Sequence, residues 1–359
     1  MKIIINTPII SAPAGVANHY LGLRPYFTNA VVYNQYMPMN YIQTKVPILH
    51  TPLRMLALFF DLIKFIILII AYRLPTVLLN PSFGPRAIQR DALFMNIAKM
   101  LKCKVAVFIH GWNNDYLQSQ LKTKDQFMSV WKNTDAFFVL AKEFEQYLRQ
   151  LGVTAPIFVT TTKVDDRMLA GMDAASQKKG EIINILFLAR IERVKGIFTA
   201  IDTFKLLKDK HPFLKMRVVG SGNALEEAKQ FVSEEGISDV TFTGSQYGEN
   251  LRNEYAAADL YILPTTHGEG MPTTVLEAMA FGLPVITRPV GGLVDFFETD
   301  KMGYLIESLN PLDYAQVIEL LINDIGKTNK ISNYNMQYAR EHFIASKVAR
   351  QLENTISKI

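Results

Sequence analysis

The sequence has a single cysteine, Cys103, among its 359 residues. A lone cysteine can form neither an internal disulfide nor a cysteine-based zinc site, so we expect a cytoplasmic protein. The charged fraction of 20% is slightly low, and the apolar fraction of 49% is ordinary for a globular chain. These values exclude intrinsic disorder, a collagen repeat and a disulfide-rich scaffold. The length favours two domains, because a domain averages about 100–200 residues.

Acidic residues are scarce in the first part of the chain. Residues 1–110 contain 11 Lys and Arg but only 2 Asp and Glu, which gives +9 and leaves −4 for the remainder of the overall +5. Such asymmetry favours an anionic partner such as a membrane, a nucleic acid or a phosphorylated ligand. An inert basic surface would give the same count, so charge alone leaves both interpretations open.

Long uninterrupted apolar runs are also missing. The stretch before Asn6 is too short for a signal peptide, and we expect a buried strand there. Residues 55–72 come closest to a membrane span, but Asp61 and Lys64 interrupt them. Arg54, Asp61 and Lys64 fall on one side of a helix, opposite a broad apolar face. The pattern predicts a core helix or a helix lying in a membrane interface, and the core helix is favoured as the more common outcome.

Short apolar runs alternate with helix-like segments along the whole chain. This alternation, with runs that are continuous rather than period-two, predicts doubly wound parallel sheets covered on both faces. Helices are expected near 198–208 and 224–235. Ten strands are expected, at residues 3–5, 77–79, 105–109, 136–140, 157–160, 183–188, 216–219, 240–243, 260–263 and 285–287.

Residues 164–181 are polar and small, which is typical of a linker. We therefore expect Rossmann-like domains at 1–170 and 171–335, with a C-terminal helix at 336–359 packing back on the first domain. Two similar α/β domains around one linker predict a central cleft as the default ligand site.

Two segments carry the residues best suited to chemistry. In residues 263–295 a glycine loop leads into a helix from about Thr274, whose free N–H groups suit a phosphate. Glu269 lies in the loop and Glu277 in the first turn, where Thr274 and Glu277 have the spacing of a capping box. In residues 187–196, Arg190 and Lys195 flank a loop and would suit a diphosphate. The structural alternatives are a helix-capping role for Glu277 and a solvated basic loop for Arg190 and Lys195.

Together these segments resemble the C-terminal half of the retaining GT-B glycosyltransferases of family 4. Glu269 and Glu277 match the Glu-x7-Glu motif of that family, and Arg190-x4-Lys195-Gly196 matches its Gly-Arg-x4-Lys-Gly element with Ala189 in place of the first glycine. The similarity runs in order over about 120 residues, from Ile183 to Ile306. It includes Val219-Gly220-Ser221-Gly222, Phe242-Thr243-Gly244, Leu276-Glu277-Ala278-Met279-Ala280, Gly282-Leu283-Pro284-Val285-Ile286 and Gly291-Gly292.

The resemblance implies a role for each matching residue. Arg190 and Lys195 would neutralise the diphosphate of a nucleotide-sugar, UDP-sugar most of all, as charge develops on the leaving group. Glu277 would bind the ribose and Glu269 the transferred sugar. The donor site would also include Gly220, Gly244, Gly270, Met271, Pro272, Thr273 and Thr274. The sequence has no Asp-x-Asp, so no metal clamp and no cofactor are expected.

The N-terminal half resembles the family only loosely. Gly15 follows the first strand where the family has a Gly-Gly pair, and here the pair is Ala14-Gly15. His110 ends a strand where the family often has a histidine near the donor sugar, although a structural role is equally open.

The candidate residues for acceptor binding are chosen by their charge alone. Arg86 and Arg90 could meet an acceptor phosphate, and Asp115 or Asp91 could serve as a base. For both aspartates a solvated surface position is the favoured interpretation.

Several other functions fit less well. A dinucleotide site would need a third glycine where Leu225 stands, and a P-loop and a Gly-x-Ser-x-Gly elbow are missing. Nucleic-acid binding would not explain the acidic site residues. A GT-B UDP-sugar epimerase and a non-catalytic nucleotide-sugar-binding homologue remain open.

The expected function is a metal-independent retaining hexosyltransferase of cell-surface polysaccharide biosynthesis. Its acceptor would be a glycan or a lipid-diphosphate-linked sugar. The basic first part and the apolar face of residues 55–72 predict peripheral association with the inner face of the plasma membrane.

Overall fold

The computed structural model describes residues 2–9, 15–37, 50–172 and 181–359. They form two compact units. The N-terminal unit comprises Met1–Lys163, Gly268–Met271 and Ala345–Ile359, and the C-terminal unit comprises Val164–His267 and Pro272–Ile344. The chain thus leaves the first unit after Lys163, contributes Gly268–Met271 to it, and returns to it for good at Ala345, whereas the expected boundaries were at 170 and 336.

The N-terminal unit is built on a parallel sheet of six strands in the order β2-β1-β3-β4-β5-β6. Its order reverses between β1 and β3, which makes that position the topological switch point. The strands are β1 (Lys2–Pro8), β2 (Ala30–Tyr36), β3 (Thr76–Leu79), β4 (Val105–Phe108), β5 (Ala136–Val139) and β6 (Ile157–Val159).

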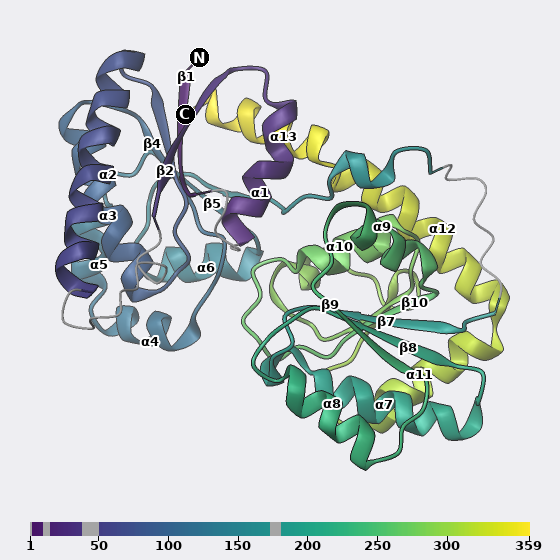
Figure 1. Ribbon diagram of the computed structural model, residues 1–359. Helices are drawn as coiled ribbons and strands as arrows, with labels where there is room; N and C mark the ends of the chain where they lie inside the picture. Colours follow the sequence, from purple (N-terminus) through teal and green to yellow (C-terminus); the bar gives the residue numbers. More distant parts are fainter. Residues whose placement is uncertain (1, 10–14, 38–49, 173–180) are drawn as a thin grey trace. The chain divides into compact units, whose positions relative to one another are not determined.

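Helices cover both faces of this sheet. On one side α2, α3 and α5 lie next to one another, and on the other side α1 packs against α13 (Figure 1). The core on the first side contains Phe65, Phe94 and Trp131, all essentially buried. The helices are α1 (Gly15–Leu23), α2 (His50–Tyr72), α3 (Pro85–Met100), α4 (Asn114–Lys122), α5 (Lys124–Trp131), α6 (Lys142–Gln150) and α13 (Ala345–Ile356), with a 3-10 turn η1 (Arg24–Tyr26).

The C-terminal unit contains a second parallel sheet of six strands in the order β12-β11-β10-β7-β8-β9. Counted along the chain, this is the 3-2-1-4-5-6 order of a dinucleotide-binding fold, with its switch point between β7 and β10. The strands are β7 (Asn184–Leu188), β8 (Lys215–Val219), β9 (Val240–Gly244), β10 (Leu260–Leu263), β11 (Val285–Thr287) and β12 (Gly303–Leu305).

Its helices also form two layers. Helices α7, α8 and α11 lie on one side of the sheet, and α9, α10 and α12 lie on the other (Figure 1). The expectation of doubly wound parallel sheets is therefore confirmed for each unit. The helices are α7 (Ile197–Lys210), α8 (Leu225–Glu234), α9 (Gly248–Ala257), α10 (Thr273–Ala280), α11 (Pro311–Asn323) and α12 (Ile325–His342), with 3-10 turns η4 (Asp166–Leu169), η5 (Arg193–Lys195) and η6 (Gly291–Asp295).

All ten expected strands are present, but two further strands were not expected. The sequence pattern did not predict β2, because polar residues such as Asn34 and Gln35 interrupt its apolar run. Asn34 is nevertheless fully buried, because its side-chain amide bonds to Asn6 of the neighbouring strand at 2.8 Å. β12 has only three residues and begins with Gly303, which is too short for a pattern to show.

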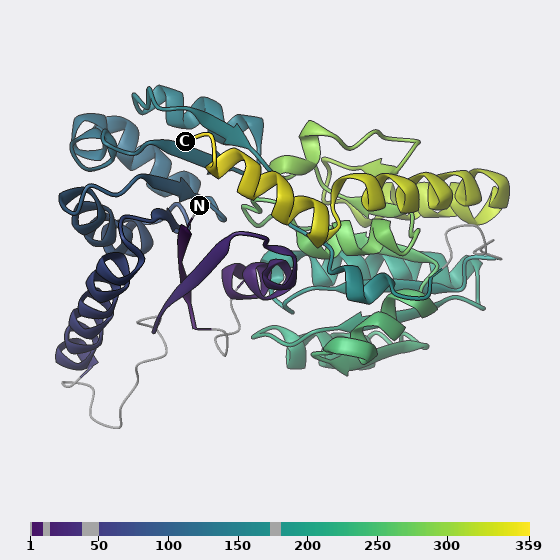
Figure 2. The same cartoon turned by 90° about the horizontal axis from the view of Figure 1, so that it is seen from above.

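The preference for a buried core helix at residues 55–72 is wrong. Helix α2 buries only a narrow stripe that includes Phe65 and Ile69. By length and composition alone, Thr51–Tyr72 is long and apolar enough to cross a membrane. Figure 2 shows α2 at the periphery of the N-terminal unit, beside β2. Apolar side chains on its outer side are largely exposed: Met55, Leu56, Phe59, Phe60, Ile63, Ile67 and Ile70.

The last helix, α13, is attached to the N-terminal unit by a buried carboxylate. Glu353 is 3% exposed and accepts hydrogen bonds from the backbone N–H groups of Thr28 and Asn29 at 3.0 and 2.7 Å, and from the Thr28 hydroxyl at 2.9 Å. Burial acts to raise the pKa of Glu353, but these hydrogen bonds outweigh it, so the pKa is lowered.

We predict that Glu353→Ala lowers the free energy of unfolding by about 2 kcal/mol, since it removes the charge-assisted hydrogen bonds that a buried carboxylate makes with the backbone of Thr28 and Asn29. Chemical denaturation measures this loss. Asn354→Ala, at the adjacent exposed position of α13, is the matched control. An equal effect of the two substitutions would contradict the anchoring role of Glu353.

Candidate functional site

At the carboxyl edge of the C-terminal sheet, loops approach one another so closely that only glycine fits. A Cβ atom on Gly220 would lie 1.9 Å from the carbonyl oxygen of Ala189, and one on Gly196 would lie 2.2 Å from that of Pro264. Both glycines also have positive φ, of 139° and 80°. The loops after β7, β8 and β10 are therefore held together at the switch point, where open α/β sheets bind ligands.

Arg190 and Lys195 lie on the loop and 3-10 turn that follow β7. Arg190 is mostly exposed and pairs with Glu192 at 2.9 Å. Lys195 is buried at the end of η5. The preceding carbonyl, that of Val194, accepts the backbone N–H of Thr266 at 2.8 Å and so ties this turn to the loop after β10.

Helix α10 begins at Thr273, and its N-cap is Pro272, which supplies no side-chain hydrogen bond. The expected capping box of Thr274 and Glu277 is therefore wrong, because Thr274 is already inside the helix and Glu277 lies beyond the first turn. Without a side-chain cap, the first N–H groups of α10 remain available for an anion. Gly244, at the end of β9, has open space around it.

Glu277 is held instead by an aromatic residue from another helix. Its Oε2 accepts a hydrogen bond from the hydroxyl of Tyr255 in α9 at 2.7 Å. Burial and the neighbouring Glu277 carboxylate raise the pKa of Tyr255, so its hydroxyl stays a donor. Similarly, the Tyr261 hydroxyl lies 2.7 Å from Oγ1 of Thr274 and donates to the carbonyl of Leu188 at 3.0 Å. These two tyrosines fix the polar residues of α10.

The loop segment Gly268–Met271 belongs to the N-terminal unit, and it carries Glu269, which is half-buried. A Cβ on Gly270 would lie 2.4 Å from the carbonyl oxygen of His110, and one on Gly268 would lie 3.0 Å from that of Trp112. Glu269 is therefore flanked by two glycines that press against the chain after β4. Met271 is buried.

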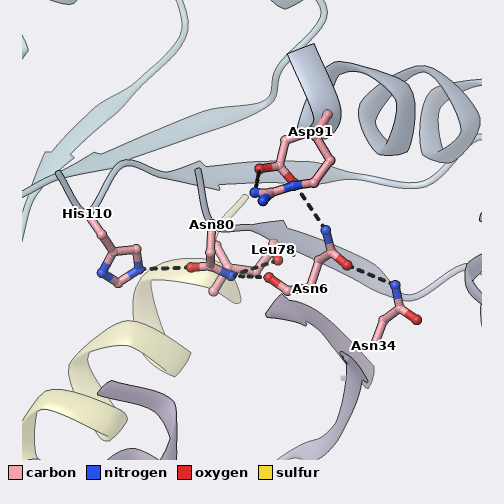
Figure 3. A network of polar contacts seen from close by, with 7 residues as sticks. Asn6, Asn34, Leu78, Asn80, Asp91 and His110 are labelled. Atoms are coloured by element: carbon pink, nitrogen blue, oxygen red, sulfur yellow. Dashed lines mark hydrogen bonds and ion pairs between the residues drawn. The ribbon is translucent and has the colours of Figure 1, made fainter. Parts of the chain in front are cut away.

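A buried polar network lies at the switch point of the N-terminal sheet (Figure 3). Asn80, directly after β3, bonds to His110 after β4, and Asn6 in β1 bonds to Asn34 and to Asp91 of α3. The Tyr20 hydroxyl of α1 also donates to Asn80, at 2.6 Å. Asn6, Asn34, Asn80 and Tyr20 were not among the expected site residues. The one available signal was that Asn80 follows an apolar run at the end of a parallel strand.

The expected surface position of Asp91 is wrong. Asp91 is fully buried and pairs with Arg90, whose guanidinium also stacks over the Tyr36 ring at 4.1 Å. Burial raises the pKa of Asp91, and the charge and hydrogen bonds of Arg90 and Asn6 oppose that rise.

Of the other acceptor candidates, Arg86 is exposed in the first turn of α3 and Asp115 is exposed in the first turn of α4. Gly15 begins α1, whereas Ala14 lies outside the described residues.

Two histidines adjoin the network in uncharged form. Burial lowers the pKa of His110 to about 3. Burial lowers the pKa of His19 as well, with contributions from His110 and Lys163. The rings of the two histidines are 5.1 Å apart, and neither ring nitrogen of His19 has a partner among the described residues. The described part of the chain holds no group of three or more His, Cys, Asp or Glu residues suited to a metal ion.

We predict that acid destabilises the N-terminal unit through these histidines. Their pKa in the folded protein lies below the value of about 6.5 for an unfolded chain. As the pH falls through 6.5, these histidines therefore become protonated in the unfolded chain but not in the folded chain, and the free energy of unfolding decreases. The loss between pH 7 and pH 5 should be about 2 kcal/mol per histidine, measured by urea denaturation.

His19→Phe should remove about half of this pH dependence, while His342→Gln, at an exposed position of α12, should leave it unchanged. A free energy of unfolding that is constant from pH 7 to pH 5 would contradict the assignment.

Comparison with known proteins adds a family match for one part of the chain. Residues 172–338 match the family described as glycosyl transferases group 1. The D-inositol 3-phosphate glycosyltransferase of Paenarthrobacter aurescens is 27% identical over 179 residues, which cover 48% of this chain and 42% of that protein. The putative colanic acid biosynthesis glycosyltransferase of Escherichia coli is 22% identical over 241 residues, covering 65% and 58%. The chain therefore spans less than two thirds of the length of these relatives.

Among solved structures, the Anabaena protein HepE in complex with UDP and glucose superposes with a TM-score of 0.73. Its sequence identity is 17%, and the superposition covers 100% of both chains. At this identity the likeness establishes the fold alone. Residues 172–338 thus match the glycosyl transferases group 1 family, and the chain as a whole has the GT-B fold.

Proposed function

We propose that this protein is a retaining glycosyltransferase that moves a hexose from a nucleotide-diphosphate sugar to a glycan or a lipid-linked acceptor. The observation that carries the proposal is the carboxyl edge of the C-terminal sheet, where Arg190, Lys195 and the uncapped start of α10 occupy adjoining loops. Two cations and a helix N-terminus at one switch point suit a diphosphate.

Each side chain then has a defined task. Arg190 and the N–H groups of α10 stabilise the diphosphate as it gains negative charge on leaving the sugar, the type of electrostatic contribution that is usually largest in such sites. Glu277, oriented by Tyr255, accepts hydrogen bonds from the ribose hydroxyls. Glu269 accepts hydrogen bonds from the transferred sugar. Retention of the anomeric configuration rests on the family resemblance alone.

The names of the relatives support the choice of substrates. HepE was crystallised with UDP and glucose, and the Escherichia coli relative is named for colanic acid biosynthesis, so we propose a UDP-sugar donor and a role in cell-surface polysaccharide assembly. Exposed Arg86 is the better candidate for an acceptor phosphate, because Arg90 is engaged by Asp91 and Tyr36. Exposed Asp115 remains the candidate acceptor base.

Metal independence is part of the proposal. Arg190, Lys195 and the α10 N-terminus supply the positive potential that a metal ion provides to a diphosphate in other sites. An epimerase or a non-catalytic homologue would use the same donor site. Only transfer to an acceptor separates the proposed activity from these two alternatives.

We predict that one nucleotide-sugar from a panel of UDP-, GDP-, ADP- and dTDP-sugars raises the thermal unfolding temperature in the presence of EDTA. A donor at a hundredfold excess over its dissociation constant stabilises the folded state by about 2.7 kcal/mol. Arg190→Ala should weaken donor binding about tenfold to a hundredfold, because it removes a charge-assisted contact. Glu277→Gln, which retains an acceptor for Tyr255, should weaken binding by a similar factor.

The matched control is Glu226→Ala, which removes a carboxylate that is 82% exposed in α8 and should leave donor binding unchanged. A donor response that requires added divalent metal would contradict metal independence. No response to any donor would contradict the donor site.

We further propose that α2 docks this protein on the inner face of the plasma membrane. At 100° per residue, the seven exposed apolar side chains of its outer side and that of Leu53, which is 38% exposed, fall within an arc of about 160°. Phe59, Phe60 and Ile70 are 57%, 59% and 65% exposed. The charges within the helix face the other way: Lys64 donates to the carbonyl of Gln35, and Asp61 accepts from the backbone of Met37 at 3.3 Å. The outer face of α2 is therefore apolar throughout.

Exposed cations gather where α2 ends. Arg73 follows the helix, Lys2 begins β1 and lies over the Tyr72 ring at 5.6 Å, and Lys102 and Lys104 precede β4. Each cation near an anionic membrane contributes about 1 kcal/mol, and each buried apolar side chain adds to this. An apolar helix face beside basic residues suits an anionic lipid surface.

We predict that the protein sediments with vesicles of anionic lipid at low salt, and much less with purely zwitterionic vesicles. Phe59→Ser combined with Ile63→Ser should weaken binding about a hundredfold, because two large apolar side chains no longer enter the interface. The matched control is Leu312→Ser with Leu320→Ser, which removes two exposed leucines of α11 in the C-terminal unit.

Failure to sediment with anionic vesicles would contradict the membrane assignment. A concentration-dependent dimer that the α2 substitutions abolish would assign the apolar face to a second copy of the chain instead.

A further inference from the structure

The side-chain amide of Asn80 has an orientation that its partners determine. Its nitrogen lies 3.0 Å from the carbonyl oxygen of Asn6 and 3.1 Å from that of Leu78 (Figure 3). Carbonyl oxygens only accept hydrogen bonds, so the atom that faces them must be the NH₂ group. The Oδ1 atom of Asn80 must then point to the opposite side.

That oxygen determines the tautomer of His110. Oδ1 of Asn80 accepts from the Tyr20 hydroxyl at 2.6 Å and lies 3.0 Å from Nε2 of His110. An amide oxygen has no proton to donate, so Nε2 of His110 must carry the hydrogen. In a neutral imidazole the other nitrogen, Nδ1, then has only a lone pair.

The surroundings keep the ring neutral. Phe108 stacks on it with ring centroids 3.9 Å apart, and the titratable groups that face it are His19 and Tyr20 of α1, at 5.1 and 6.0 Å between ring centroids. Lys163 acts on the neighbouring His19, whose pKa its charge helps to lower. None of these groups favours a charged imidazolium. Among the described residues, none donates a hydrogen bond to Nδ1.

His110 also lies where a ligand is expected. It follows β4, next to the β1–β3 switch point, and Gly270 of the Glu269 loop presses against its carbonyl. Its side chain is partly accessible, unlike that of His19.

We propose that Asn80 is a positioning residue that locks His110 as the Nε2–H tautomer, so that Nδ1 acts purely as an acceptor for a hydroxyl group of the transferred sugar. This inference rests on the proposed glycosyltransferase function and deepens it. A ring held neutral in this way recognises a hydroxyl but does not remove its proton, because a base of such low pKa is too weak. Donors whose hydroxyl is replaced by fluorine, which cannot donate, should therefore be rejected.

The tautomer can be measured without any assay of activity. In the full-length protein labelled with ¹⁵N-histidine, long-range ¹H–¹⁵N spectra distinguish a pyridine-type nitrogen from a pyrrole-type one. We expect Nδ1 of His110 to be pyridine-type from pH 5 to pH 8, with the signals assigned by their loss in His110→Gln. In Asn80→Ala the signals should shift toward a mixture of tautomers. In Asn80→Asp, which retains an acceptor but adds a charge, His110 should become protonated at higher pH.

Tyr20→Phe is the matched control. It removes the other donor to the same oxygen but keeps the bond between Asn80 and His110, so the tautomer should not change. A pyrrole-type Nδ1 in the unaltered protein, or a tautomer that Asn80→Ala leaves unchanged, would overturn the assignment of Asn80.

The ligand half of the inference is tested by a cycle of variants and donors. Asn80→Ala and His110→Gln should each reduce kcat/KM for the natural donor about tenfold to a hundredfold. For the singly deoxygenated donor that lacks the recognised hydroxyl, neither substitution should cause a further loss. If the two substitutions reduced kcat/KM by the same factor for every deoxygenated and fluorinated donor, hydroxyl recognition by His110 would be overturned. No transfer from any donor would contradict the proposed function instead, while the spectra would still decide the tautomer.

Discussion

Both sheets of this protein are parallel and carry helices on both faces, and this constraint decides where polar side chains can act. A strand covered on both sides is mostly apolar, and a polar side chain inside it needs a hydrogen-bond partner, so most polar groups concentrate where the strands end. The reversal of strand order then leaves an opening at the carboxyl edge, beside β1 and β3 in one sheet and β7 and β10 in the other. Asn80 and Arg190 each follow a strand at such an opening.

Local patterns were enough to predict most of the fold, and they also singled out the charged residues of the candidate site. All strands of the C-terminal unit except β12 could be predicted, because they are short, continuous apolar runs bounded by turn residues. The pattern alone left a solvated basic loop open for Arg190 and Lys195, and the resemblance to the motifs of a glycosyltransferase family favoured the donor site. The proximity of these two residues to the start of α10 follows from topology, since loops after adjacent parallel strands must meet at the same edge.

What the sequence could not predict depends on contacts between distant segments. Asn34 and Asn6 are polar residues inside strands, and their burial makes sense only once β1 and β2 pair and the two amides bond to each other. Glu277 has the spacing of a capping box, yet the N-cap of the helix is Pro272, and Tyr255, 22 residues earlier, donates to the Glu277 carboxylate. The apolar face of α2 has the periodicity of a core helix. Whether such a face is covered depends on the number of elements around it, which no local pattern reveals.

The two units offer opposite electrostatics for recognition. In the C-terminal unit Arg190, Lys195 and a helix N-terminus supply positive potential, which suits the diphosphate end of a nucleotide-sugar. In the N-terminal unit the groups around His110 are neutral, because burial would make an imidazolium there costly. Sugar hydroxyls carry no charge, so they are recognised by the direction of hydrogen bonds. A neutral ring with a fixed tautomer presents one acceptor in one direction, and a donor lacking the matching hydroxyl would leave that acceptor unpaired. Selectivity for the sugar then depends on Asn80, a residue that need not touch the sugar itself.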